Sequence, residues 1–134
     1  MVDIRLFRKK NNVSKQKISE KDWPLHVITL DDSNFDEFIL KYPLSVIDFT
    51  SKACVYCRTM EPRMRRLAQL YKGKVAFGKL DTHKNPNTAK KYNILGVPNF
   101  LFFSYGKKIG QRTGKKSVGE IKDTINDMIK DFSD

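Results

Sequence analysis

The chain lacks the features of several common protein classes. It has only two cysteines in 134 residues, too few for the disulfide framework of a small secreted scaffold. It has no continuous run of about 20 apolar residues, which a membrane-spanning helix needs. Its first residues also lack the apolar block of about 7–15 residues found in a signal peptide. We therefore expect a cytoplasmic protein without membrane contact, made of one domain and a short extension.

Acidic residues are scarce relative to basic ones. The chain holds 26 Lys and Arg against 15 Asp and Glu, which gives a formal net charge of +11 and a sequence pI near 9.7. Residues 1–22 carry a net +4 and few apolar side chains, so we interpret them as a basic, mostly flexible N-terminal extension. Within it, Val2, Ile4 and Leu6 alternate with polar residues as in a short strand. Residues 23–134 form the predicted domain, and its basic balance favours acidic partners.

From residue 25 onward, strand-like and helix-like periods alternate along the chain. Two helix starts carry a capping-box pattern, Ser33 with Asp36 and Ser117 with Glu120, and Pro62 is expected to kink the longest helix. This alternation predicts an α/β fold with a central mixed sheet between helices, in the order β-α-β-α-β-α-β-β-α. The strands are expected at 26–30, 44–50, 75–80, 99–105 and 108–112, with helices from Ser33, over 54–72, over 87–92 and from Ser117.

The two cysteines lie close together in Cys54-Val55-Tyr56-Cys57, where an apolar strand passes into the long helix. Unpaired amides and the positive end of the dipole at a helix start favour the reactive thiolate form of Cys54. Arg58 adds positive charge nearby. A two-residue spacer within one helical turn allows Cys57 to attack a mixed disulfide formed on Cys54. The pair therefore predicts dithiol–disulfide exchange.

Asp48 is the one charged residue in the apolar strand 44–50. Alternation places it on one face with Val46 and Thr50, and both faces of such a strand are expected to be covered. Burial raises the pKa of a carboxyl group, which makes Asp48 a candidate proton acceptor for the Cys57 thiol. Lys79, near the end of the next strand, is a candidate charge partner.

Other uses of these residues are less consistent with the sequence. A zinc site needs about four ligands, and only His26 and His83 remain to join the cysteines, neither at metal-site spacing, so we predict no metal. Two alternatives stay open: an adaptor in which the cysteines are incidental, and a module that binds nucleic acid or another anionic surface through basic segments 63–66 and 115–116. No nucleic-acid motif or interleaved aromatic residues accompany those segments, which favours a solvated basic surface.

Further landmarks follow in a fixed order, and together they resemble the thioredoxin family from about Leu25 to the C-terminus. They are Asp48 in VIDF, the CxxC motif, Pro62 five residues later, Lys79-Leu80-Asp81, the stretch 85–94 and Gly96-Val97-Pro98. The resemblance implies the thioredoxin fold, with Cys54 as the exposed nucleophile and Cys57 as the resolving thiol. It also implies that Asp48 and Lys79 are a buried proton-transfer pair, that the Val97–Pro98 bond is cis, that Val97 and Pro98 contact substrate, and that Gly114 lets substrate approach closely.

The resemblance implies the activity as well. It predicts an oxidoreductase without a cofactor that reduces disulfides in client proteins, receives electrons from a donor of the thioredoxin-reductase type, and acts as a monomer in cell redox homeostasis.

Several positions depart from the family pattern, which implies an altered substrate face and a reduction potential that is not carried over from the family. Ala53 and Thr50 stand where thioredoxins carry tryptophan, and the only tryptophan, Trp23, lies outside the match. Val55-Tyr56 replaces Gly-Pro between the cysteines, and Asn99 replaces threonine after Pro98.

Overall fold

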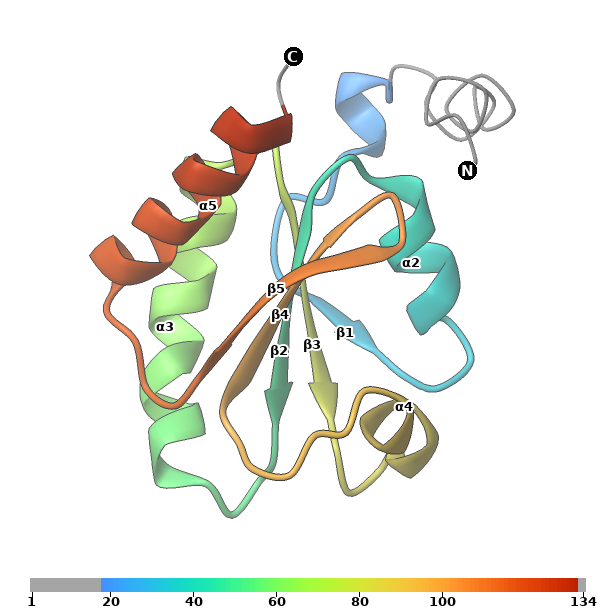
Figure 1. Ribbon diagram of the computed structural model, residues 1–134, viewed down its shortest axis with the longest axis vertical. Coiled ribbons are helices and arrows are strands. Elements are labelled where there is room, and N and C mark those ends of the chain that lie inside the picture. Colours follow the sequence, from blue (N-terminus) through green and yellow to red (C-terminus); the bar gives the residue numbers. More distant parts are fainter. Residues whose placement is uncertain (1–17, 133–134) are drawn as a thin grey trace.

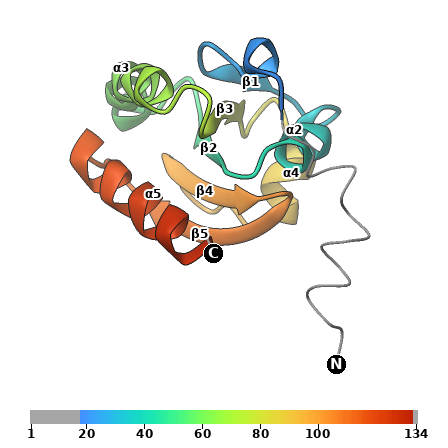
Figure 2. The same ribbon diagram turned by 90° about the horizontal axis from the view of Figure 1, so that it is seen from above.

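The structure of the chain, a computed structural model, describes residues 18–132. A five-stranded sheet lies between two layers of helices (Figure 1), and the view from above separates α3 and α5 on one face from α2 and α4 on the other (Figure 2). The predicted α/β class and element order are confirmed. The strands are β1 (Ile28–Leu30), β2 (Ser45–Thr50), β3 (Ala76–Asp81), β4 (Asn99–Ser104) and β5 (Lys107–Thr113). The helices are the 3-10 helix η1 (Glu20–Asp22), α2 (Phe35–Lys41), α3 (Val55–Leu70), α4 (Pro86–Lys91) and α5 (Val118–Phe132).

The sheet is mixed, with the strand order β1-β3-β2-β4-β5. Strand β3 pairs in parallel with both β1 and β2, whereas β4 runs antiparallel to β2 and β5 antiparallel to β4. Parallel β2 and β3 therefore end at the same edge of the sheet, and the segments that follow them begin there (Figure 1). The cysteines lie at this edge because they follow β2 directly.

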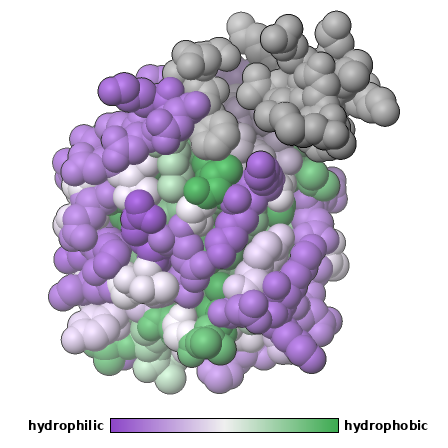
Figure 3. Space-filling view, in the orientation of Figure 1, coloured by the Kyte–Doolittle hydropathy of each residue, from purple (hydrophilic) through white to green (hydrophobic). Residues whose placement is uncertain are grey.

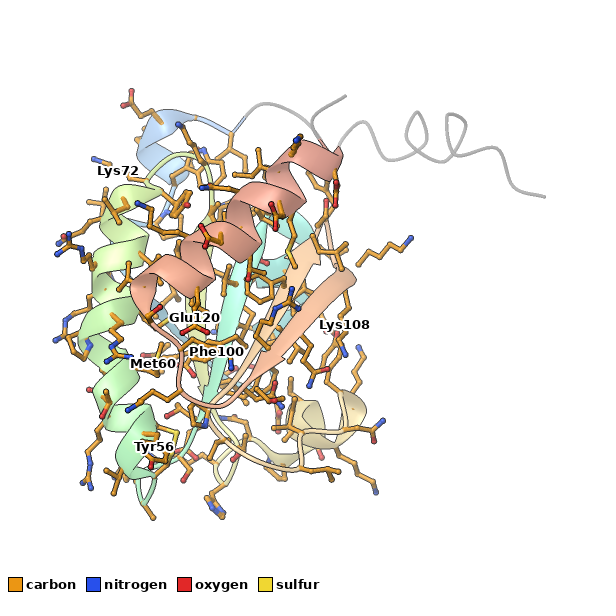
Figure 4. All side chains as sticks on the ribbon, turned by 60° about the vertical axis from the view of Figure 1, so that its left-hand side comes forward. Tyr56, Met60, Lys72, Phe100, Lys108 and Glu120 are labelled. Carbon is orange, nitrogen blue, oxygen red and sulfur yellow. A yellow bond between two sulfur atoms is a disulfide. The ribbon has the colours of Figure 1, made fainter. Side chains whose placement is uncertain are left out.

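Each face of the sheet has its own apolar cluster. Val46 belongs to the cluster under α3 and α5, where the side chains of Met60 and Phe100 lie between helix and sheet (Figure 4). Ile47 and Phe49 belong to the cluster under α2 and α4. Alternation along β2 therefore follows the predicted pattern, with both faces covered.

The first described residues pack against the domain. Ile18 contacts a small cluster that contains Trp23, Tyr42 and Ala76, and the Trp23 and Tyr42 rings lie 5.1 Å apart. Part of the proposed extension, residues 18–22, therefore includes a short helix and an apolar contact. The strand expected at Val2, Ile4 and Leu6 lies outside the described residues, and the division at residue 22 stays a prediction.

Two local expectations are wrong. At the first predicted capping box, α2 begins after Asn34, whose side chain makes no cap hydrogen bond, and Asp31 instead accepts hydrogen bonds from the amides of Ser33 and Asn34 at 2.8 and 2.9 Å. This short Asx turn takes up the free amides before the helix starts. The hairpin turn after β4 also lies one residue earlier than expected, at Tyr105 and Gly106, which both have positive φ, as a tight hairpin turn requires.

Other local expectations hold. The capping box at α5 is confirmed, since the Ser117 Oγ accepts from the Glu120 amide at 3.1 Å and the Glu120 carboxylate from the Ser117 amide at 3.2 Å. Helix α3 runs through Pro62 as one element, and its kink stays a prediction. In residues 18–132, no helix combines the length and apolar character needed to cross a bilayer.

Candidate active site

Cys54 is the N-cap residue of α3, in an extended conformation just before the first helical turn. Its sulfur accepts a hydrogen bond from the Cys57 amide at 3.0 Å, which uses one of the free amides at the helix start. The two cysteines form a disulfide, and their Cα atoms lie 5.2 Å apart, within the usual range for such a bond. The structure thus places both sequence-predicted sulfurs together at the end of β2.

The two cysteines differ in exposure. Cys57, in the first turn of α3, is only 1% exposed, whereas Cys54 is half-buried and borders the surface. The residues between them project outward, with Val55 63% and Tyr56 57% exposed. A partner sulfur therefore has access to Cys54 and not to Cys57.

A second wall of the site is the loop before β4. The Val97–Pro98 peptide bond is cis, as the resemblance implies, and the Val97 carbonyl oxygen lies 3.7 Å from the Cys54 sulfur. Gly114 joins this loop to the end of β5, because its amide donates to the Pro98 carbonyl at 2.8 Å. Its φ of +86° requires glycine, and the space where a Cβ would project is open.

A cleft of about 450 Å³ lies along this second wall. Its lining includes one fully exposed apolar residue, Leu95, which is 97% exposed. Apolar surface is visible at the lower edge of Figure 3, where Figure 1 places the turn into α3 and the loop before β4. No lining residue carries a charge: they are Asn93, Leu95, Gly96, Val97, Pro98, Asn99, Gln111, Thr113 and Gly114.

Asp48 lies on β2, on the face covered by α3, and is 3% exposed. Within the described residues its Oδ1 has no hydrogen-bond partner. Burial raises the pKa of Asp48 to about 7, the negative charge of Glu61 adds to the rise, and Lys79 opposes it. The predicted rise is confirmed, and it leaves a carboxyl group that exchanges protons near neutral pH.

Lys79 lies near Asp48 as expected, but the two side chains do not form a salt bridge within 4.0 Å. It lies opposite Asp48 in the parallel register of β2 and β3, so both side chains leave the same face of the sheet. Among residues 18–132 the only ion pair within 4.0 Å joins Lys91 and Asp36. Lys79 therefore acts on Asp48 through the field across the sheet face.

The thioredoxin resemblance implies that Lys115 lies near the sulfurs, but two specific interactions at the site have no signal in the sequence. The ammonium group of Lys115 lies 5.2 Å from the centre of the Tyr56 ring, and Glu61 acts on Asp48. Residues so far apart along the chain give no local pattern for such a contact, although the basic pair 115–116 and the unusual Tyr56 are both visible in the sequence. His26 and His83 join no metal-ligand cluster among the described residues.

The mixed five-stranded sheet and the CxxC disulfide at the start of the long helix α3 together define a class of protein. They are typical of α/β proteins that catalyse dithiol–disulfide exchange. The thioredoxin family model matches residues 26–127, and the chain belongs to the thioredoxin family. It is accordingly a disulfide oxidoreductase that acts by dithiol–disulfide exchange through its CxxC pair.

Thioredoxins from several organisms are similar to this chain. The thioredoxin of Buchnera aphidicola subsp. Schizaphis graminum is 35% identical over 105 residues, covering 78% of this chain and 97% of that protein. The thioredoxin of Synechocystis is 36% identical, covering 73% and 92%. The chloroplastic M-type thioredoxin of Pisum sativum is 39% identical, covering 77% of this chain and 60% of that protein.

A solved structure confirms the fold. A mutant thioredoxin from Halobacterium salinarum superposes with a TM-score of 0.74 at 24% identity, covering 78% of this chain and 92% of the other.

Proposed function

We propose that this protein reduces disulfides in client proteins, with Cys54 as the attacking thiolate and Cys57 as the resolving thiol. The observation that carries this assignment is the difference in exposure, since Cys54 is half-buried, with its sulfur 3.7 Å from the Val97 carbonyl of the cleft wall, and Cys57 is 1% exposed. The start of α3 further stabilises negative charge on Cys54, because the Cys54 sulfur already accepts a hydrogen bond from the Cys57 amide.

The reaction proceeds in two exchanges. The Cys54 thiolate attacks one sulfur of the client disulfide, the client bond breaks, and the displaced client sulfur leaves as a thiolate that takes up a proton. Cys57 then loses its proton and attacks the Cys54 sulfur, which releases the second client thiolate. The client gains two electrons and two protons, and the protein ends with the Cys54–Cys57 disulfide seen in the structure.

Asp48 is the proposed proton acceptor for Cys57 in the second exchange. Its pKa of about 7 allows it to hold or release a proton at neutral pH, and its Oδ1 has no competing partner among the described residues. Lys79 is its positioning partner, since its charge favours the ionised carboxylate.

The cleft is the proposed docking site for an extended client segment. The Val97 carbonyl beside Cys54 offers a backbone hydrogen-bond acceptor, and cis-Pro98 fixes the loop that carries it. The open space beside Gly114 leaves room for a second backbone. Clients thus bind mainly through their backbone.

We further propose a cytoplasmic monomer whose electrons come from a donor of the thioredoxin-reductase type. Thioredoxins of Buchnera and Staphylococcus haemolyticus are among its relatives, and chloroplastic M-type thioredoxins are as well. The domain spans residues 23–134 and residues 1–22 are a basic extension. The basic surface charge favours acidic partners, and the sequence offers no nucleic-acid motif or interleaved aromatic residues that would support a nucleic-acid function.

The test is dithiothreitol-driven turnover of a disulfide-containing protein by the full chain. We expect Cys54→Ser and Cys57→Ser each to abolish catalytic turnover, and Lys72→Gln, at the far end of α3, to match wild type. Equal turnover in wild type and both cysteine variants would refute the redox function and favour an adaptor with incidental cysteines.

A further inference from the structure

The site holds a charged contact that the exchange chemistry does not use. Tyr56, between the two cysteines, presents its ring to the ammonium group of Lys115 at 5.2 Å, within the range of a cation–π interaction. Both side chains are exposed, and Tyr56 lies at the start of α3 (Figure 4). The Tyr56 ring therefore holds the flexible lysine side chain next to the short segment that separates the two cysteines.

The backbone that carries Lys115 is fixed on both sides. On one side the Gly114 amide donates to the Pro98 carbonyl at 2.8 Å. On the other side the Lys116 carbonyl accepts from the Arg63 guanidinium at 2.8 Å, and the Lys116 amide lies 3.4 Å from the Met60 sulfur. The segment 114–116 therefore bridges the cleft wall and α3, and Lys115 sits between them with a defined position.

Charge around the site is concentrated at its rim. The cleft lining is uncharged, so the lining itself does not distinguish acidic from basic clients. Lys115 follows the lining residue Gly114 directly, and its ammonium group lies over the ring of Tyr56, one of the two residues between the cysteines. Along residues 52–61, 93–99 and 111–116, which carry the disulfide and the cleft wall, the other charged residues are Lys52, Arg58, Glu61, Arg112 and Lys116, of which only Glu61 is negative.

We propose that Lys115, positioned by the Tyr56 ring, is a specificity-determining residue that selects client segments with Asp or Glu next to their disulfide. The inference rests on the proposed function, because it concerns which disulfides reach Cys54. An ammonium group already held over a ring loses little further freedom when it pairs with a carboxylate, which favours acidic clients at the docking step. Tyr56 acts through Lys115 and is a positioning residue.

The test uses disulfide-bridged peptides that are identical except for Glu, Gln or Lys beside one cysteine. The pre-reduced full chain is mixed with each peptide, the reaction is quenched with acid, and mass spectrometry gives the second-order rate constant for reduction. At low salt we expect the Glu peptide to be reduced about fivefold faster than the Lys peptide, the size expected for exposed charge pairs. The ratio should fall toward one in high salt.

Substitutions test whether Lys115 and Tyr56 cause the rate difference between the Glu and Lys peptides. Lys115→Gln should lower the Glu-to-Lys ratio below about twofold, and Lys115→Glu should invert it. Lys72→Gln removes the same charge at the other end of α3 (Figure 4) and should keep the wild-type ratio. Tyr56→Leu should lower the ratio, whereas Tyr56→Phe, which keeps an aromatic face, should preserve it.

The outcomes separate two failures. A pre-reduced wild-type protein that reduces none of the peptides contradicts the proposed function itself. Reduction of all three at equal rates, or an unchanged ratio in Lys115→Gln, overturns only the role of Lys115. Equal ratios in Tyr56→Leu and Tyr56→Phe overturn the positioning role of the ring.

Discussion

The two faces of the sheet are built for different purposes. Under α2 and α4, Phe35 contacts Phe49, Tyr92 and Phe103, with ring centres 5.5–5.9 Å apart, and no acid or base is buried there among the described residues. Under α3 and α5, an apolar cluster surrounds Asp48, whose Oδ1 has no partner within residues 18–132. The side of the sheet under α2 and α4, which we call the aromatic face, is filled by closely packed rings. The side under α3 and α5 contains a buried carboxyl group whose ionised form is disfavoured.

The two faces of the sheet therefore contribute differently to stability and to the exchange chemistry. A buried carboxyl group lowers stability wherever it must ionise in the folded state, and Asp48 lies on β2, the strand that leads into the cysteines. The aromatic face, which has no reactive group, supplies packing energy that offsets this cost. Substitutions on the two faces should therefore have opposite effects on stability near neutral pH.

The largest effect is expected on the aromatic face. Phe35→Ala should lower the free energy of unfolding by about 3–5 kcal/mol, because Phe35 is 1% exposed and its loss leaves a cavity among three rings. Urea denaturation measures the change, with Leu25→Ala, 63% exposed, as a near-neutral control. A loss under about 1 kcal/mol would contradict the packing role of this face.

Asp48→Asn should act in the opposite direction and depend on pH. The pKa of Asp48 is raised from 3.8 to about 7, so the folded state holds a proton that the unfolded state has released between these values. Wild-type stability therefore falls as pH rises through this window and levels off above it. Relative to its effect at pH 3.5, Asp48→Asn should stabilise the oxidised protein at pH 8 by up to about 4 kcal/mol.

The comparison is made by urea denaturation of both proteins across the pH range. The same variant should release clients from the mixed disulfide more slowly at neutral pH, because Cys57 lacks its proton acceptor. A stability difference that does not change with pH would show that Asp48 titrates normally.

The smallest effect concerns the two charges near Asp48. Glu61→Gln should lower the pKa of Asp48, because Glu61 raises it, and Lys79→Met should raise the same pKa, because Lys79 lowers it. Carbon-13 NMR titration of the Asp48 carboxyl group measures both shifts. Shifts of the same sign in the two variants would contradict the assignment of these charges.

Much of the fold could be predicted from the sequence because it is encoded locally. The apolar run around Asp48 and the alternation of Val46 and Ile47 report burial on both faces of β2, and the Ser117–Glu120 pattern marks the start of α5. The start of α2 departs from its pattern because Asp31, upstream of the capping-box residues, takes up the neighbouring amides in an Asx turn.

The site was only partly encoded locally. The spacing of Cys54 and Cys57 within one helical turn is visible in the sequence and predicts a disulfide. The Lys115–Tyr56 contact depends on how segment 114–116 is fixed between the cleft wall and α3, which is a tertiary effect without a local pattern. The influence of Glu61 on Asp48 likewise arises from helix packing over β2.

The central claim is that Cys54 attacks and Cys57 resolves, and trapping tests it most directly. The reduced Cys57→Ser and Cys54→Ser variants are each mixed with a disulfide-containing protein, and non-reducing electrophoresis with peptide mass spectrometry identifies any covalent adduct. We predict a stable mixed disulfide through Cys54 in Cys57→Ser and none in Cys54→Ser. An adduct through Cys57 in Cys54→Ser, with none in Cys57→Ser, would contradict the account.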